Sequence, residues 1–118
     1  MSKKIDELIE FLGWRILIPG RAEMVETGYA GDLLSLVMAH APRGSVWITV
    51  QRHLNIIAVA SLMEIPAILI AHGLEPEAEV RKKAAEEGIW LLGTKEDPFR
   101  ASGRLFQALR RPTDALDG

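Results

Sequence analysis

The sequence contains no cysteine among its 118 residues. Disulfide bonds, thiolate zinc sites, iron–sulfur ligation and a cysteine nucleophile are therefore excluded for this chain. It also lacks a continuous apolar run of the roughly 18 residues that a membrane-spanning helix needs; its longest such run, Ile56 to Met63, is short. Asp6, Glu7 and Glu10 follow the N-terminal lysines, and no apolar signal-peptide core comes after them. We therefore expect a cytoplasmic protein with no membrane partner.

An excess of positive charge is missing as well. The chain has 14 Lys and Arg against 16 Asp and Glu, which gives a formal net charge of −2. Nucleic-acid-binding domains are usually basic and have clustered lysines and arginines, so no nucleic-acid partner is expected. The hydrophobic content of 48% and the charged content of 25% are ordinary for a soluble globular domain.

Complete patterns for metal binding and nucleophilic catalysis are absent. None of the three histidines forms a strong metal-ligand pattern with another histidine or a carboxylate; they are His40, His53 and His72. The serines that could be considered as nucleophiles all lie inside helical patterns rather than on a strained strand-to-helix turn; they are Ser35, Ser61 and Ser102. We predict no metal, no cofactor and no catalytic residue. A carboxylate pair formed in space stays open, from among Asp32, Glu64, Glu75 and Asp97.

The chain does contain an alternation of strand-like and helix-like segments. A first helix is predicted between a Ser2 cap and Gly13. Further helices are predicted at about 32–41, 55–63, 75–87 and 98–109, strands at 14–18, 45–50, 67–71 and 89–92, and a short extended segment at 21–26. This alternation predicts one α/β domain over 1–111, in three α/β/α layers, with a mostly parallel sheet of four or five short strands. A flexible C-terminal tail is expected over 112–118.

Three stretches together resemble the DRTGG-domain family, especially its small stand-alone members. They are TGYAGDLLSLVMAHAPRGSVWITVQRHLNIIAVASL, IPAILIAHGLEP and EEGIWLLGTKEDPFRASGRL. The resemblance covers Lys4 to Leu109 and implies a fold similar to the N-terminal domain of HPr kinase/phosphorylase. In this family the domain occurs between the CBS domains of some inorganic pyrophosphatases and within some phosphotransacetylases. Small stand-alone members often occur beside iron-only hydrogenase genes.

The resemblance implies a regulatory or protein-interaction role, because the domain is not the catalytic part in these settings. It also implies a homodimer, with a protein partner in a metabolic or hydrogenase-related system. The sequence departs from the family pattern in VETGYAGD, where Tyr29 stands in place of a second glycine after Thr27 and Gly28. The P-loop of true HPr kinases is absent, so kinase activity is not expected.

The segment TGYAGD is the first candidate site, with Thr27, Gly28, Tyr29, Gly31 and Asp32. Glycines before a helix permit positive φ or close backbone approach, and free N–H groups at a helix N-terminus can bind a phosphate. Asp32, however, stands where the N-cap belongs, and its carboxylate would occupy those donors and repel an anion. We therefore predict chiefly a helix cap here, with anion binding and partner contact as the alternatives.

The segment TVQRHLN is the second candidate site, with Thr49, Gln51, Arg52, His53 and Asn55. It follows a predicted strand, and ligands of α/β sheets favour the carboxyl ends of strands. Arg52 could bind a carboxylate or phosphate. The alternative is that His53 or Asn55 caps the next helix and that Gln51 satisfies loop backbone. An anion bound at TGYAGD would take its cation from Arg52 or His53.

The C-terminal RASGRLFQALRR combines arginines with apolar residues at helical spacing. It predicts an amphipathic helix whose aliphatic side closes the core, with partner binding or a weak nucleic-acid contact as alternatives. Three functions follow from the whole sequence. The favoured one is a non-catalytic regulatory or interaction module; the others are a sensor of a nucleotide or other anion between the Gly28–Asp32 and Gln51–Asn55 loops, and an accessory metabolic enzyme.

Overall fold

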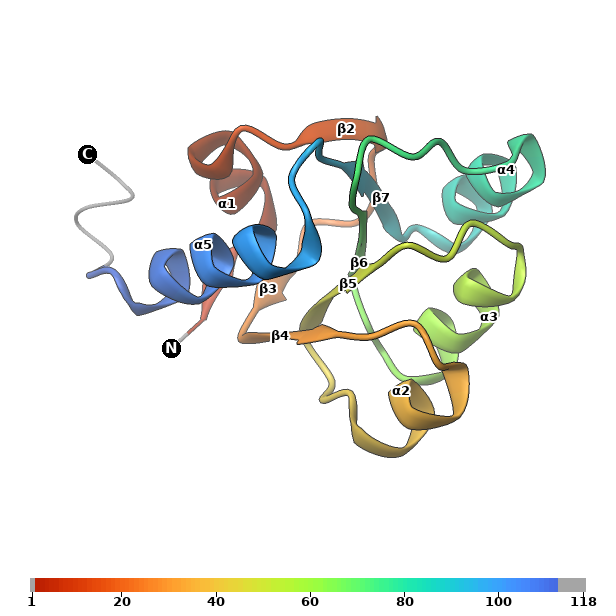
Figure 1. Ribbon diagram of the computed structural model, residues 1–118, viewed down its shortest axis with the longest axis horizontal. Coiled ribbons are helices and arrows are strands. Elements are labelled where there is room, and N and C mark those ends of the chain that lie inside the picture. Colours follow the sequence, from red (N-terminus) through yellow and green to blue (C-terminus); the bar gives the residue numbers. More distant parts are fainter. Residues whose placement is uncertain (1, 113–118) are drawn as a thin grey trace.

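The computed structural model describes residues 2–112 of the chain (Figure 1). The expected tail over 112–118 therefore falls almost entirely outside the described residues. The helices are α1 (Ile5–Leu12), α2 (Leu34–His40), α3 (Asn55–Leu62), α4 (Ala78–Glu87) and α5 (Pro98–Arg110). The strands are β1 (Lys3–Lys4), β2 (Arg15–Ile18), β3 (Met24–Val25), β4 (Thr27–Ala30), β5 (Ser45–Thr49), β6 (Ala67–Ile70) and β7 (Trp90–Gly93).

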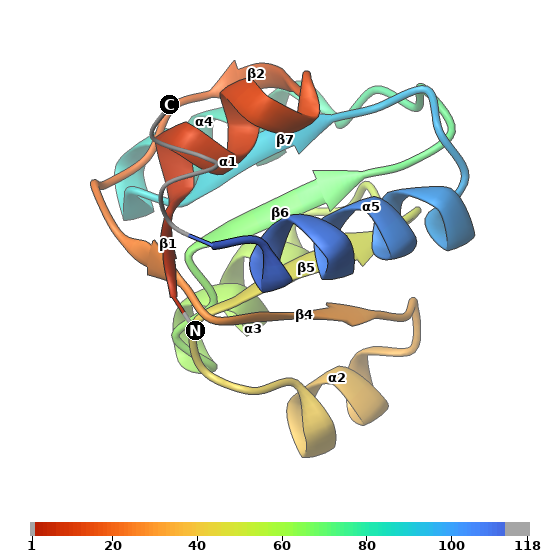
Figure 2. The ribbon, with the colours of Figure 1, turned by 90° about the vertical axis from the view of Figure 1, so that its left-hand side faces the viewer.

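A five-stranded sheet in the order β2-β7-β6-β5-β4 forms the centre of the molecule. Strands β4, β5, β6 and β7 are parallel, and β2 joins β7 antiparallel. Figure 2 shows the strands side by side, with β2 and β4 at the two edges. The predicted α/β class and the mostly parallel sheet are confirmed. A small antiparallel pair of β1 and β3 was not predicted, although the segment 21–26 was expected to be extended.

Helices cover both faces of the sheet, as the three-layer prediction requires. Helices α1 and α5 lie on one face, and α2, α3 and α4 lie on the other (Figure 1). Strands β5, β6 and β7 are buried along their whole length, which explains why their sequences are apolar without alternation. Two separate cores result, one on each side of the sheet.

The first helix differs at its start from the prediction. It begins at Ile5, with Lys4 as the N-cap and no side-chain capping bond, because Lys3 and Lys4 pair with β3 instead. Its end agrees with the prediction. Gly13 takes φ 72°, and its N–H donates to the carbonyl of Ile9. Glycine is favoured in this left-handed conformation because it has no Cβ.

The segment TGYAGD is the main correction to the predicted elements. Its residues Thr27–Ala30 form β4, an edge strand, rather than a turn before a helix. Helix α2 then begins at Leu34 instead of Asp32, and its N-cap is Leu33, which makes no side-chain capping bond. The strand was missed because it contains Gly28 and Ala30, residues that are uncommon in strands, and because Gly31 and Asp32 directly after it suit a loop.

The carboxyl ends of β4, β5, β6 and β7 meet at one edge of the sheet, which we call the carboxyl edge. The loops that leave it cover residues 31–33, 50–54, 71–77 and 94–97. Both candidate segments from the sequence end at this edge. It is therefore the first place to look for a site.

Candidate functional site

Asp32 joins the loops that follow β4 and β5. Its Oδ1 accepts hydrogen bonds from Thr49 Oγ1 at 2.8 Å and from the Val50 N–H at 2.9 Å. Gln51 Nε2 in turn donates to the Asp32 carbonyl at 2.8 Å. We call this group the Asp32 clamp. The prediction that Asp32 caps α2 is wrong, because its carboxylate holds the end of β5 instead.

The glycines of TGYAGD allow close packing rather than positive φ. Neither Gly28 nor Gly31 has a positive φ. A Cβ on Gly28 would lie 2.6 Å from Leu105 Cδ2, so this glycine lets α5 approach β4. The backbone of Gly31 is already engaged, since its N–H donates to the Ile48 carbonyl and its carbonyl accepts from Trp47 Nε1 at 2.8 Å. The segment is thus a packed strand end and not an open anion cradle.

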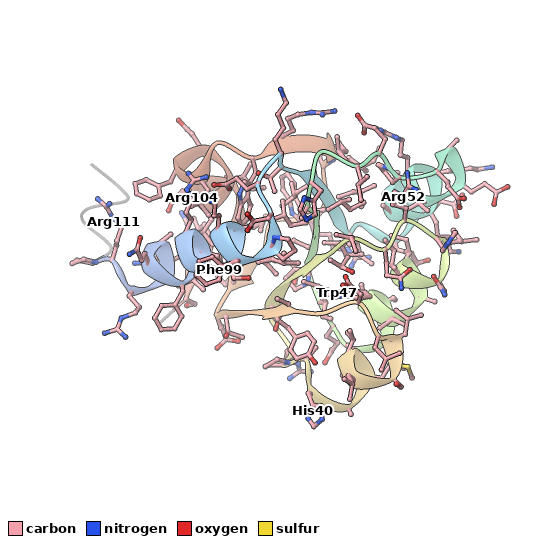
Figure 3. All side chains as sticks on the ribbon, viewed as in Figure 1. His40, Trp47, Arg52, Phe99, Arg104 and Arg111 are labelled. Atoms are coloured by element: carbon pink, nitrogen blue, oxygen red, sulfur yellow. The ribbon has the colours of Figure 1, made fainter. Side chains whose placement is uncertain are left out.

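The second candidate segment meets the first at the carboxyl edge, but its charged residues turn elsewhere. His53 Nδ1 lies 3.5 Å from Glu77 Oε1, at the start of α4. Arg52 is exposed, and Figure 3 shows it on the α4 side of the molecule rather than beside β4. Helix α3 has Leu54 as its N-cap and no side-chain capping bond, so the expectation of a cap by His53 or Asn55 is wrong. The expectation that Gln51 satisfies loop backbone is confirmed.

The loops after β6 and β7 are also joined to each other, in this case by backbone hydrogen bonds. His72 and Gly73 take φ 62° and 67°, and the Leu74 N–H donates to the Ala71 carbonyl, which makes a tight turn of the mirror-image type. The His72 N–H donates to the Glu96 carbonyl at 2.9 Å. The turn thus places the loop after β6 against the loop after β7. Its tie to the next loop could not be predicted, because the sequence does not show which loops are neighbours.

Helix α5 uses one of its arginines to hold the fold together. Arg104 Nη1 lies 2.8 Å from Glu96 Oε1, and Arg104 Nη2 donates to the Leu12 carbonyl at 2.8 Å. Arg104 therefore connects α5 to α1 and to the loop after β7. The aliphatic side of α5 closes one core, as the amphipathic pattern predicts.

The carboxylates that could have formed a catalytic pair have separate partners. Glu64 pairs with Arg43, Glu75 bridges two arginines, and Asp97 accepts from the N–H of Arg100 as the N-cap of α5. Within residues 2–112 no group of three or more His, Asp and Glu side chains could hold a metal ion. No helix of the described residues is long and apolar enough to cross a membrane.

An apolar surface lies around β4 and was not recognised from the sequence. A pocket of about 180 Å³ opens between β4 and α5, and no charged residue lines it; the lining includes Gly28, Ala30, Ser102, Leu105 and Phe106. Phe106 is 61% exposed, and Phe99, about two turns earlier on the same side of α5, is 86% exposed. On the other side of β4, helix α2 exposes Leu33, Leu36 and Met38. Tyr29 connects the two sides, since its hydroxyl donates to the Leu36 carbonyl at 3.5 Å.

We call this area the β4 surface, defined by Tyr29, Leu33, Leu36, Met38, Phe99 and Phe106. The signal for it was present in the sequence. The spacing of Phe99, Ser102 and Phe106 places them on one side of α5, whereas the buried residues of that helix, Ala101, Leu105, Ala108 and Leu109, form a different side. Helix α5 thus has two apolar sides, and one of them is not buried in the core.

Comparison with known proteins shows that the fold also occurs in a solved regulatory protein. No family model matches the chain, and no curated protein matches it. The CBS and DRTGG domains of the regulatory region of Clostridium perfringens pyrophosphatase, solved in complex with the activator diadenosine tetraphosphate, have a similar structure with a TM-score of 0.71. The match covers 95% of this chain and 49% of that chain at 19% sequence identity. The chain thus spans about half of that regulatory region, and at this identity the likeness shows a shared α/β fold.

Proposed function

We propose that this protein is a non-catalytic regulatory or protein-interaction module of DRTGG type that assembles as a homodimer. The β4 surface is the observation that carries the proposal. Large apolar side chains gathered on one exposed area are typical of interaction sites. The resemblance of the sequence to DRTGG domains and the fold shared with a pyrophosphatase regulatory region support the same role. On this proposal its protein partner acts in a metabolic or hydrogenase-related system in the cytoplasm.

The hydrogen bonds at the carboxyl edge support a structural role for its polar residues, and not a role in chemistry. Asp32, Thr49 and Gln51 bind one another and the adjacent backbone. The loops after β6 and β7 are bound to each other through His72 and Gly73. Groups held in this way position loops, and we propose that their function is to fix the shape of the surface offered to a partner.

Sedimentation velocity tests the homodimer. We expect a species with twice the 13.1 kDa chain mass at low micromolar concentration. A single species of 13.1 kDa up to 100 μM would contradict the proposal. Activity assays with phosphoryl and acyl donors should give no turnover, and a rate that Asp32→Ala abolishes without unfolding the protein would contradict the non-catalytic part.

A small-ligand sensor is the second candidate function. The Asp32 clamp brings the two candidate loops together at the carboxyl edge, and Arg52 and His53 are exposed in the loop after β5. The related regulatory region was solved with a nucleotide activator. A thermal-shift screen with diadenosine tetraphosphate, ATP, AMP and inorganic phosphate tests this function. A ligand at 100 times its Kd should add about 2.7 kcal/mol of stability, and Arg52→Ala should remove the shift while Lys82→Ala on α4 retains it.

A further inference from the structure

We propose that the homodimer forms by antiparallel pairing of β4 with β4 of a second copy, so that the two sheets join into one and the two α5 helices lie side by side. This inference rests on the homodimer proposed above and assigns its interface. Four observations carry it: the open edge of β4, the level of α5 relative to β4, the two phenylalanines of α5 and the charges at its two ends.

The backbone of β4 has hydrogen-bonding groups that face outward. The Gly31 N–H donates to the Ile48 carbonyl of β5 at 3.1 Å. Because peptide groups alternate in direction along a strand, the N–H and C=O groups of Gly28 and Ala30 then point away from β5. An antiparallel pair centred on Tyr29 places Gly28 opposite Ala30 of the second copy, and both residues have outward groups. Ala30 is exposed, so the edge is open at this point.

The centre of α5 lies at the same level as the centre of β4. Leu105 contacts the position of Gly28, and Figure 2 shows α5 running in the opposite direction to β4. One strand residue advances about 3.3 Å and one helix residue about 1.5 Å, so one step along β4 corresponds to about two residues of α5. A twofold axis through Tyr29 therefore passes near Ser102 and Gly103.

That position is the midpoint between Phe99 and Phe106. A twofold axis there brings Phe99 of one copy against Phe106 of the other, and the reverse pair forms at the same time. The residues nearest the axis are small, Ser102 and Gly103 on α5 and Gly28 and Ala30 on β4. Small residues at the axis leave room for two helices to approach, while the large exposed rings at both sides fill the remaining space.

The charges at the ends of α5 are complementary in the same arrangement. Its N-terminal end has Glu96 and Asp97, which lie 2.8 Å from Arg104 and 3.8 Å from Arg100 of the same chain, and its C-terminal end has Arg110 and Arg111. An antiparallel neighbour places Arg110 near the carboxylates at the start of the other helix. Arg110 already stacks over the Phe106 ring, with 5.4 Å between its guanidinium carbon and the ring centroid. The face is thus complementary to itself in hydrogen bonds and shape, and Arg110 would join the ion pairs at the start of the other helix.

Two single variants and their mixture test this interface. Phe99→Glu and Phe106→Lys each place a charge against a phenylalanine ring in both Phe99–Phe106 pairs of the dimer. Each variant should therefore be monomeric, with a dimer Kd raised about 30-fold or more. An equimolar mixture should regain a dimer, because Glu from one chain meets Lys from the other. The matched control is Leu62→Glu on α3, which alters another exposed apolar side chain. It should remain dimeric.

A cross-link provides a second measurement that does not depend on weakening the dimer. The chain has no cysteine, so Ser102→Cys introduces a single thiol near the axis, where two Cβ atoms can come within disulfide distance. Under mild oxidation we expect a covalent dimer, whereas Lys82→Cys on α4 should stay monomeric in a non-reducing gel.

The outcomes separate this inference from the proposed function. A wild-type monomer would end both. A wild-type dimer that persists in Phe99→Glu and Phe106→Lys, and that does not cross-link through Ser102→Cys, would overturn the β4 interface and leave the homodimer standing. If Leu36→Glu alone abolishes the dimer, the α2 side is the interface. Failure of the mixture to associate when both single variants are monomers would also overturn the pairing.

Discussion

The two outer strands of the central sheet, β2 and β4, form edges that are built in opposite ways. At the β2 edge, the pairing with β7 shifts between Ile16 and Ile18, and Arg15 extends to an ion pair with Glu75. A charge and an irregular register are features that protect an edge strand from further pairing. The β4 edge pairs regularly with β5 over four residues and has no charged side chain. The β2 edge is therefore closed to association, and the β4 edge is suited to it.

The largest effect on folding should come from filling the contact between β4 and α5. Gly28→Val places new atoms where a Cβ alone would lie 2.6 Å from Leu105 Cδ2. Overpacking of this kind should lower the free energy of unfolding by about 2–3 kcal/mol. Urea denaturation provides the measurement. Gly103→Ala is the matched control, because its new Cβ would have no atom within 4 Å. An unchanged midpoint in Gly28→Val would show that α5 does not need this close approach.

The Asp32 clamp should contribute the next largest amount. Asp32→Ala removes the acceptor for Thr49 Oγ1 and the Val50 N–H, and Thr49 is fully buried. Loss of these bonds should cost about 1–2 kcal/mol of stability. Asp32→Asn keeps an acceptor oxygen and should cost about half as much in the same urea titration. Equal costs for both variants would mean that the charge of Asp32, and not its hydrogen bonds, stabilises the end of β5.

A matched pair of lysine substitutions compares the two edges directly. Ala30→Lys on β4 and Ile16→Lys on β2 both replace exposed residues, so each should change the free energy of unfolding by no more than about 0.5 kcal/mol. Only Ala30→Lys should shift the sedimenting species from dimer to monomer. If Ile16→Lys dissociates the dimer and Ala30→Lys does not, the assignment of the two edges is reversed.

The smallest effect on stability should come from the ion pair at the protected edge. Arg15 and Glu75 are both more than half exposed, so Arg15→Met should alter stability by less than about 0.5 kcal/mol. Light scattering at high protein concentration should nevertheless rise, because the edge has lost its charge. Scattering equal to that of the wild type would show that the irregular register alone protects β2.

The sequence was sufficient for the elements whose pattern is local. The β-branched and aromatic residues of SVWIT predict β5, and the apolar run after Pro66 predicts the buried strand β6. Strand β4 was not predicted, because Gly28 within it and Gly31 directly after it are also typical of loops. Gly28 is explained by the packing of Leu105 against it, a contact from a residue distant in the sequence, whereas Gly31 lies against the ring of nearby Tyr29.

The candidate site was predicted in part for the same reason. The sequence places Thr49 and Gln51 at the end of a predicted strand and Asp32 at the start of a predicted helix, and the structure brings all three together. The role of Asp32 as a clamp depends on the parallel register of β4 and β5, which no local pattern shows. The β4 surface was not predicted, because the apolar residues of RASGRLFQALRR were interpreted as the single aliphatic side of an amphipathic helix.

Helix α2 is held to the rest of the molecule by very little. It has seven residues, and Val37 is the one that is buried. Segments with so few buried contacts open locally at a small fraction of the free energy of global unfolding. Amide hydrogens of α2 should therefore exchange with solvent well before those of β5 and β6. A partner that contacts α2 would then meet a segment that detaches and reattaches, and its binding would shift that local equilibrium.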